Sequence, residues 1–185
     1  YEAKNGGHIV EGLRDGWKSH FDFVLVDSRT GITDIGGICT IQLPDILAIV
    51  FTATLQSLEG AIEVAAKSAL RRQDLPFDRA LVPVVPIPSR FDMQTEHEVS
   101  KEWLERFEKA LSPLYEQWLP KDTNRRDFLS LTKIPHTAYF SFGEKLAVIE
   151  QGTLERTGLG HAYETVAALM ANHLEYANLL LSNRD

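Results

Sequence analysis

The sequence has little cysteine, few basic residues and no long apolar run. Its one thiol, Cys39, excludes an internal disulfide framework, a cysteine-based zinc site and an iron–sulfur cluster held by several thiolates. Nineteen Lys and Arg stand against 26 Asp and Glu, and the net charge of −7 argues against nucleic acid or an anionic membrane as a partner. The richest apolar run, residues 46–53, is far shorter than the ~20 residues that cross a bilayer. No signal-peptide pattern opens the sequence, so we expect a cytoplasmic protein.

The remaining composition is that of an ordinary globular chain. With 44% apolar and 24% charged residues over 185 positions, the chain has enough apolar material for the core of one domain. Runs rich in β-branched and aromatic residues predict strands. They cover residues 21–27, 45–52 and 79–87, the last short or irregular because of its prolines, and an extended segment over 134–142.

Apolar residues at helical spacing predict helices between these strands. The predicted helices cover residues 6–20, a stretch with Ser57 as N-cap, residues 96–119 with a bend or break near Pro113, a turn at 128–131, and residues 163–181. Alternating strands and helices predict an α/β fold with a mostly parallel sheet and helices on both faces. Ligands bind such sheets at the carboxyl ends of the strands.

The segment from Phe23 to Asp27 is an apolar run that ends in a carboxylate. This is the pattern of a Walker B strand, whose Asp holds Mg²⁺ through water beside nucleotide phosphates. The pattern is weak alone, because any buried strand can end in Asp. Gly31 follows four residues later, where a flexible backbone N–H could approach a γ-phosphate. The segment is therefore predicted to be a nucleotide-sensing switch loop.

The turn Asp27-Ser-Arg-Thr-Gly31 resembles the Asp-Ser-Pro-Ala-Gly turn of the ParA/MinD-like P-loop ATPases, the deviant Walker A group. Residues 21–61 are more similar still to a bacterial branch of that group, the KGGVGR-type NTPase domains, and residues 84–92 and 134–145 resemble later blocks of it. The resemblance implies a P-loop NTPase-like fold, ATP and Mg²⁺ as cofactors, and a homodimer formed through the nucleotide face. It also implies protein partners or attached modules, without nucleic acid or membrane.

The phosphate-binding sequence Gly-x-x-x-x-Gly-Lys-Ser/Thr does not occur in residues 1–185. The resemblance therefore implies that these residues are the C-terminal portion of a single NTPase domain, an incomplete domain whose phosphate loop lies upstream of Tyr1. We expect that the chain alone does not hydrolyse ATP.

The resemblance also assigns roles to single residues of the turn. Asp27 would be the catalytic carboxylate and the ligand on the Mg²⁺ side. Ser28 and Thr30 would bind the nucleotide beside it, and the amide of Gly31 would sense the γ-phosphate. The six histidines are scattered along the chain and predict no further metal site.

Two positions depart from the family. Arg29 replaces the family's Pro and could act as an arginine finger, or could be a surface arginine that pairs with Asp34. Ser89 and Arg90 fall where relatives carry an Asn-Arg pair near the adenine, and Pro135 belongs to an Ile-Pro segment that flanks the base. Two functions stay open: part of an ATP-binding and hydrolysing, nucleotide-dependent dimerising switch, or a non-catalytic protein-interaction module derived from such an NTPase.

Overall fold

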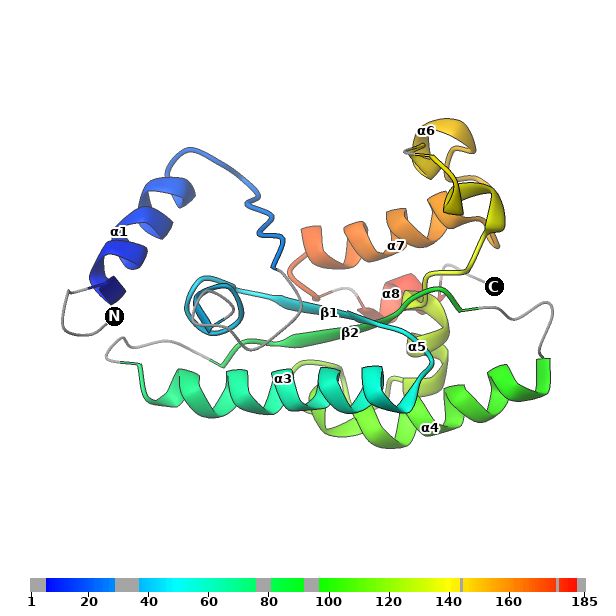
Figure 1. Cartoon of the computed structure of the whole chain (residues 1–185), viewed down its shortest axis with the longest axis horizontal. Helices are drawn as coiled ribbons and strands as arrows, with labels where there is room; N and C mark the ends of the chain where they lie inside the picture. The colour runs from blue at the N-terminus through cyan, green and yellow to red at the C-terminus, as the bar shows by residue number, and fades with distance from the viewer. Residues whose placement is uncertain are drawn as a thin grey trace. The chain divides into compact units, whose positions relative to one another are not determined.

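The computed structural model describes residues 6–28, 37–75, 81–91, 97–143, 145–175 and 177–182. The chain divides into two compact units, residues 1–47 with 66–82 and residues 48–65 with 83–185. The elements, labelled as in Figure 1, are α1 (Gly6–Lys18), η2 (Ile38–Gln42), β1 (Leu47–Phe51), α3 (Leu55–Gln73), β2 (Val84–Pro88), α4 (His97–Tyr115), α5 (Arg125–Thr132), η3 (Ala138–Ser141), α6 (Ala147–Glu150), α7 (Leu159–Ala171) and α8 (Ala177–Ser182). Helices thus dominate a mixed α/β structure, and its sheet within the described residues has two parallel strands.

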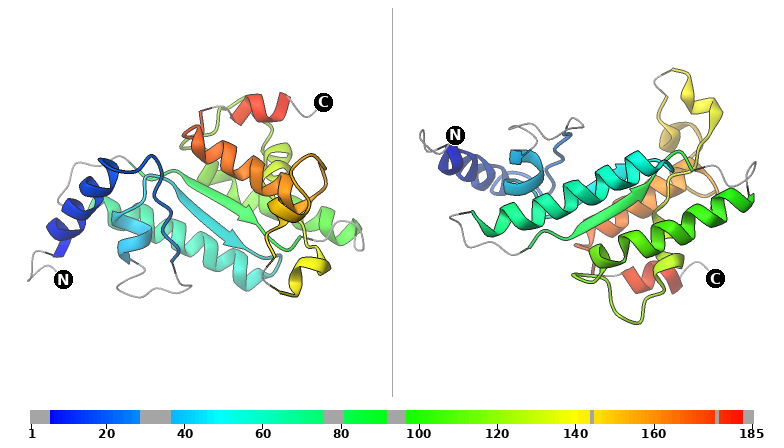
Figure 2. Two further views of the ribbon diagram at one scale, coloured as in Figure 1. Left: turned by 90° about the horizontal axis from the view of Figure 1, so that it is seen from above. Right: turned by 60° about the horizontal axis from the view of Figure 1, so that its bottom comes forward.

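The two strands lie side by side and are connected by α3 (Figure 2). The predicted N-cap of α3 was wrong by three residues, because α3 begins at Leu55 and its cap is Thr54. The Thr54 hydroxyl accepts a hydrogen bond from the Ser57 amide at 3.2 Å, the bond that an N-cap makes to the third helical residue. The Ser57 hydroxyl instead accepts from the Thr52 amide at 3.0 Å, so it holds the end of β1 to the start of the helix.

Strand β2 is buried at all five positions although it contains Pro86 and Pro88. Its predicted shortness is confirmed, and the register explains why prolines are tolerated. The Ser89 amide donates to the Phe51 carbonyl of β1 at 2.7 Å. Because N–H groups alternate in direction along a strand, the missing donors of both prolines point away from β1. On that far side the Pro88 carbonyl accepts from the Ile134 amide at 2.7 Å.

The core of the second unit is aromatic. Phe107 of α4 is fully buried and packs against the rings of Phe51 at 5.1 Å and Phe91 at 6.0 Å between centroids. Tyr115, at the end of α4, stacks edge-on against Phe128 of α5 at 5.6 Å. The apolar stripe of the predicted 96–119 helix is therefore part of the core. These rings hold α4 and α5 against the sheet.

Helix α4 continues through Pro113, where the sequence predicted a bend or break. The helix ends two residues later, at Tyr115, so the proline removes one hydrogen bond of the last turns rather than of the middle. The predicted helical turn at 128–131 is confirmed and is longer, since α5 begins at residue 125 after the N-cap Asn124.

The predicted closing helix over 163–181 is two helices, α7 and α8. Its break is a Schellman motif in which His173 takes the left-handed position normally given to glycine, at φ 52°. The amide of His173 donates to the Met170 carbonyl, and that of Leu174 to the Leu169 carbonyl, each at 3.0 Å. Leu174 is buried by this turn, which offsets the strain of a non-glycine residue at positive φ.

In the first unit, polar side chains bind the backbone of the segment around η2. The Arg72 guanidinium of α3 donates to the carbonyls of Ile41 at 2.6 Å and Pro44 at 3.1 Å, and Ser68 donates to the Thr40 carbonyl at 2.6 Å. Helix α1 has the predicted position but buries no residue. The first unit therefore depends on hydrogen bonds more than on an apolar core.

The predicted strand over 21–27 is wrong in this structure. Residues 21–27 have no strand assignment, and all of them are exposed, Leu25 to 91%. An apolar segment becomes a parallel strand only when a neighbour satisfies its N–H and C=O groups, and no described strand pairs with it. None of the helices described is long and apolar enough to span a membrane.

Candidate functional site

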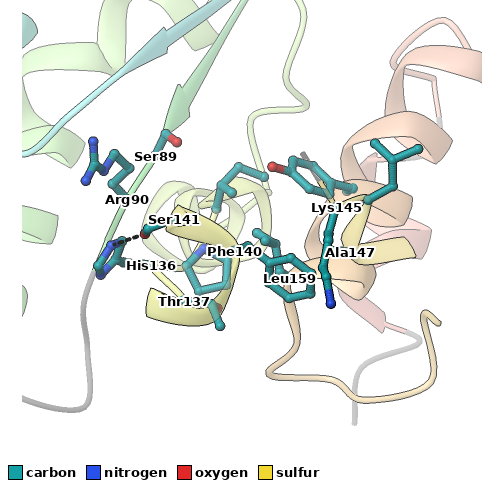
Figure 3. Close-up of a pocket in the computed structure, with 13 residues that line it drawn as sticks. Ser89, Arg90, His136, Thr137, Phe140, Ser141, Lys145, Ala147 and Leu159 are labelled. Atoms are coloured by element: carbon teal, nitrogen blue, oxygen red, sulfur yellow. Dashed lines mark hydrogen bonds between the residues drawn. The ribbon is translucent and has the colours of Figure 1, made fainter. Parts of the chain in front are cut away.

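A cavity of about 460 Å³ lies at the carboxyl end of β2, in the second unit. Figure 3 shows Ser89, Arg90 and His136 on one side of it and Lys145, Ala147 and Leu159 on the other, with Thr137 and Phe140 between. Ligands of parallel sheets bind at this edge. The walls are Ser89, Arg90, Ile134, Pro135, His136, Thr137, Phe140, Ser141, Lys145, Leu146, Ala147, Leu159 and Tyr163.

A short parallel bridge brings two distant segments together in the cavity. Phe91 pairs with Pro135: the Phe91 amide donates to the Ile134 carbonyl at 3.1 Å, and the His136 amide donates to the Phe91 carbonyl at 3.2 Å. This bridge places Ser89 and Arg90 beside Pro135. The predicted extended segment over 134–142 is limited to this bridge, because the chain then turns into η3.

Arg90 has a left-handed backbone conformation, with φ at 54°. A non-glycine residue at such an angle stores roughly 1 kcal/mol of strain, and strained residues concentrate at functional sites. Arg90 lies between the last hydrogen bond of β2 and the Phe91 bridge, so the chain changes direction at this residue. The strain therefore falls on a residue of the cavity wall.

The cavity wall carries cationic and hydroxyl groups next to aromatic rings. Lys145 donates to the Tyr139 hydroxyl at 2.6 Å and lies 3.7 Å from a carboxylate oxygen of Glu150. The hydrogen bond to Tyr139, followed by the charge of Glu150, raises the pKa of Lys145, so it stays cationic. The hydroxyl of Ser141 lies 3.3 Å from Nε2 of His136, a bond visible in Figure 3.

Only some of the predicted site residues line the cavity. Ser89, Arg90 and Pro135 line the cavity. Asp27 and Ser28 belong to the first unit and are not part of its wall. Asp27 is exposed. The remaining predicted residues of the turn, Arg29, Thr30 and Gly31, lie outside the described residues.

Several residues of the wall were not predicted. Phe140 and Lys145 fall in the 134–145 block that resembles the family, and that resemblance is the signal that could have indicated them. Leu159 and Tyr163 come from α7, and nothing in the sequence relates this helix to the end of β2. They reach the wall only because the chain folds back after α6.

The cavity wall combines apolar faces with hydroxyl groups. Phe140, Pro135 and Tyr163 offer apolar faces, and Ser89 and Thr137 offer hydroxyls. In the part of the chain that the structure describes, no three His, Cys, Asp or Glu side chains gather into a metal site. Mg²⁺ is often held by one or two carboxylates with phosphates as its other ligands, and Asp27 is the carboxylate that the resemblance assigns to it. No family model, no curated protein and no solved structure matches the chain.

Proposed function

We propose that this chain is the base-binding portion of a cytoplasmic, ATP-binding and hydrolysing switch with a P-loop NTPase-like fold and helices on both faces of its sheet. The observation that carries the proposal is the cavity at the end of β2, where Ser89, strained Arg90 and Pro135 meet. These residues are the ones that the resemblance assigns to the nucleotide base.

The cavity would hold the adenine, and the resemblance gives Asp27 of the first unit the role of Mg²⁺ ligand. Bound Mg²⁺ neutralises phosphate charge. Ser28, Thr30 and the amide of Gly31 would contact the phosphates, with Arg29 as a cation for charge that develops there. In the longer protein that the resemblance implies, two copies would associate through the nucleotide face and pass the nucleotide state to protein partners.

Saturation-transfer NMR with ATP on residues 1–185 tests the cavity. We expect transfer to the adenine protons, and we expect that Arg90→Gly reduces it while relieving the strain at φ 54° and raising the melting temperature. Arg71→Ala removes an exposed arginine of α3 as a matched charge control, and its transfer should equal that of the wild type. A chain that binds no nucleotide, with or without Mg²⁺, would refute the proposal.

Hydrolysis is a separate test. Purified residues 1–185 should show no ATP turnover, and turnover that disappears in Asp27→Ala would contradict this expectation. The alternative function, a non-catalytic interaction module, is favoured by Ser89 in place of the family's Asn. It predicts that the longer protein retains nucleotide binding without hydrolysis.

A further inference from the structure

The cavity at the end of β2 is lined by basic side chains. Among its described wall residues are Arg90, His136 and Lys145, and none of those wall residues is Asp or Glu. The whole chain, by contrast, has 26 acidic residues against 19 lysines and arginines. A cleft lined by charge of one sign concentrates ligands of the opposite sign. The cavity wall therefore favours a ligand that carries an anionic group.

The two permanent cations of the wall differ in what surrounds them. The ammonium group of Lys145 donates to the Tyr139 hydroxyl at 2.6 Å and lies 3.7 Å from a carboxylate oxygen of Glu150, which offsets its charge. The guanidinium of Arg90 makes no ion pair or side-chain hydrogen bond with any residue that the structure describes. An anionic group that enters the cavity is therefore attracted more strongly to Arg90 than to Lys145.

The backbone of Arg90 is held beside that of His136. The amides on either side of Arg90 both donate to backbone carbonyls, so its strained conformation is fixed from both ends. The next residue, Phe91, accepts a hydrogen bond from the His136 amide at 3.2 Å. Figure 3 shows Arg90 and His136 on the same side of the cavity, with the Ser141 hydroxyl 3.3 Å from Nε2 of His136. Guanidinium, imidazole and hydroxyl groups thus lie on one side of the wall, and Lys145 lies on the other.

These three groups match the chemistry of a phosphate. A guanidinium offers a rigid fork of N–H donors to two phosphate oxygens, and an imidazole or a hydroxyl adds a single donor. We propose that Arg90, His136 and Ser141 bind a phosphate group of the ligand, so that the cavity takes nucleoside phosphates in preference to nucleosides. The choice of a nucleoside rests on the proposed function, whereas the phosphate site rests on the basic groups of the wall. Pro135 and Phe140 leave apolar faces for the base.

Isothermal titration of residues 1–185 with adenosine and with AMP, both without Mg²⁺, tests the proposal. The wild type should bind AMP about tenfold more tightly than adenosine, because charged hydrogen bonds to phosphate are strong but the exposed Arg90 and His136 are screened by water and salt. Arg90→Gln removes the charge and keeps a non-glycine residue at φ 54°, and its ratio of the two Kd values should fall to about one. Arg90→Lys should retain part of the preference. Arg71→Gln, at an exposed arginine of α3, is the matched charge control and should keep the wild-type ratio.

A titration of the wild type with inorganic phosphate, followed at the Nε–Hε NMR signal of Arg90, tests the phosphate site without a nucleoside. A shift of this signal supports the proposal, and it decides the matter should Arg90→Gln fail to fold by circular dichroism. Equal Kd values for adenosine and AMP would overturn the proposal and leave the proposed function standing. Phosphate that shifts the Arg90 signal while adenosine and AMP do not bind would support the phosphate site and refute the proposed function. An Arg71→Gln variant that loses the preference as fully as Arg90→Gln, or phosphate that leaves the Arg90 signal unchanged, would also overturn the proposal.

Discussion

Replacing Gly160 by alanine tests whether the backbone at Gly152 lies on the start of α7 as the structure has it. The new Cβ would lie 2.0 Å from the Gly152 carbonyl oxygen, whereas real Cβ atoms stay at least 3.0 Å from such atoms. The two backbones would have to separate by about 1 Å. The clash is with a backbone carbonyl, so it cannot be relieved by moving a flexible side chain. We expect a loss of about 2–3 kcal/mol, and a fall in melting temperature of roughly 5–10 °C in a chain of this size.

The matched control is Gly60→Ala in the middle of α3, where a Cβ meets nothing within 4 Å. There alanine should stabilise the helix by about 0.5–1 kcal/mol, because glycine loses more backbone entropy on folding. The same chemical change therefore has opposite signs at the two positions. Urea unfolding of both variants measures this difference. A Gly160→Ala variant as stable as the wild type would refute the close approach of the Gly152 backbone to α7.

Three further predictions concern stability. Arg72→Ala should cost about 2–3 kcal/mol, because two backbone carbonyls of segment 38–44 lose their donor, while the exposed Arg71→Ala should stay within ~0.5 kcal/mol in the same urea titration. The Tyr115 hydroxyl is buried without a partner among the described residues, so Tyr115→Phe should stabilise the fold by about 1 kcal/mol. Burial raises the pKa of Tyr115 above its ordinary value, so as the pH rises the unfolded chain loses this proton at a lower pH than the folded chain. The free energy of unfolding should therefore fall above about pH 10, and more in the wild type than in Tyr115→Phe. His173→Gly should raise the melting temperature. Glycine takes the left-handed conformation after α7 with roughly 1 kcal/mol less strain than histidine.

The spacing of apolar residues predicted those helices and strands that pack against elements next to them in the sequence. Strand β1, helix α3 and strand β2 follow one another, and their apolar runs and prolines indicated each of them. The cap of α3 was misplaced because Ser57 and Thr54 are both good cap residues, and only the backbone angles choose between them. Of the cavity wall, the resemblance indicated Ser89, Arg90 and Pro135 in advance.

Tertiary pairing decided the rest. Composition alone determined a chain without an internal disulfide framework, and the alternation of apolar segments predicted an α/β fold with a parallel sheet. Residues 21–27 have the composition of a buried strand, yet a strand exists only when a hydrogen-bonded neighbour lies beside it. The end of α7 at His173 depends on the burial of Leu174, and the cavity depends on α7 folding back beside β2. Each of these outcomes rests on contacts between residues far apart in the chain, which periodicity within one segment does not contain.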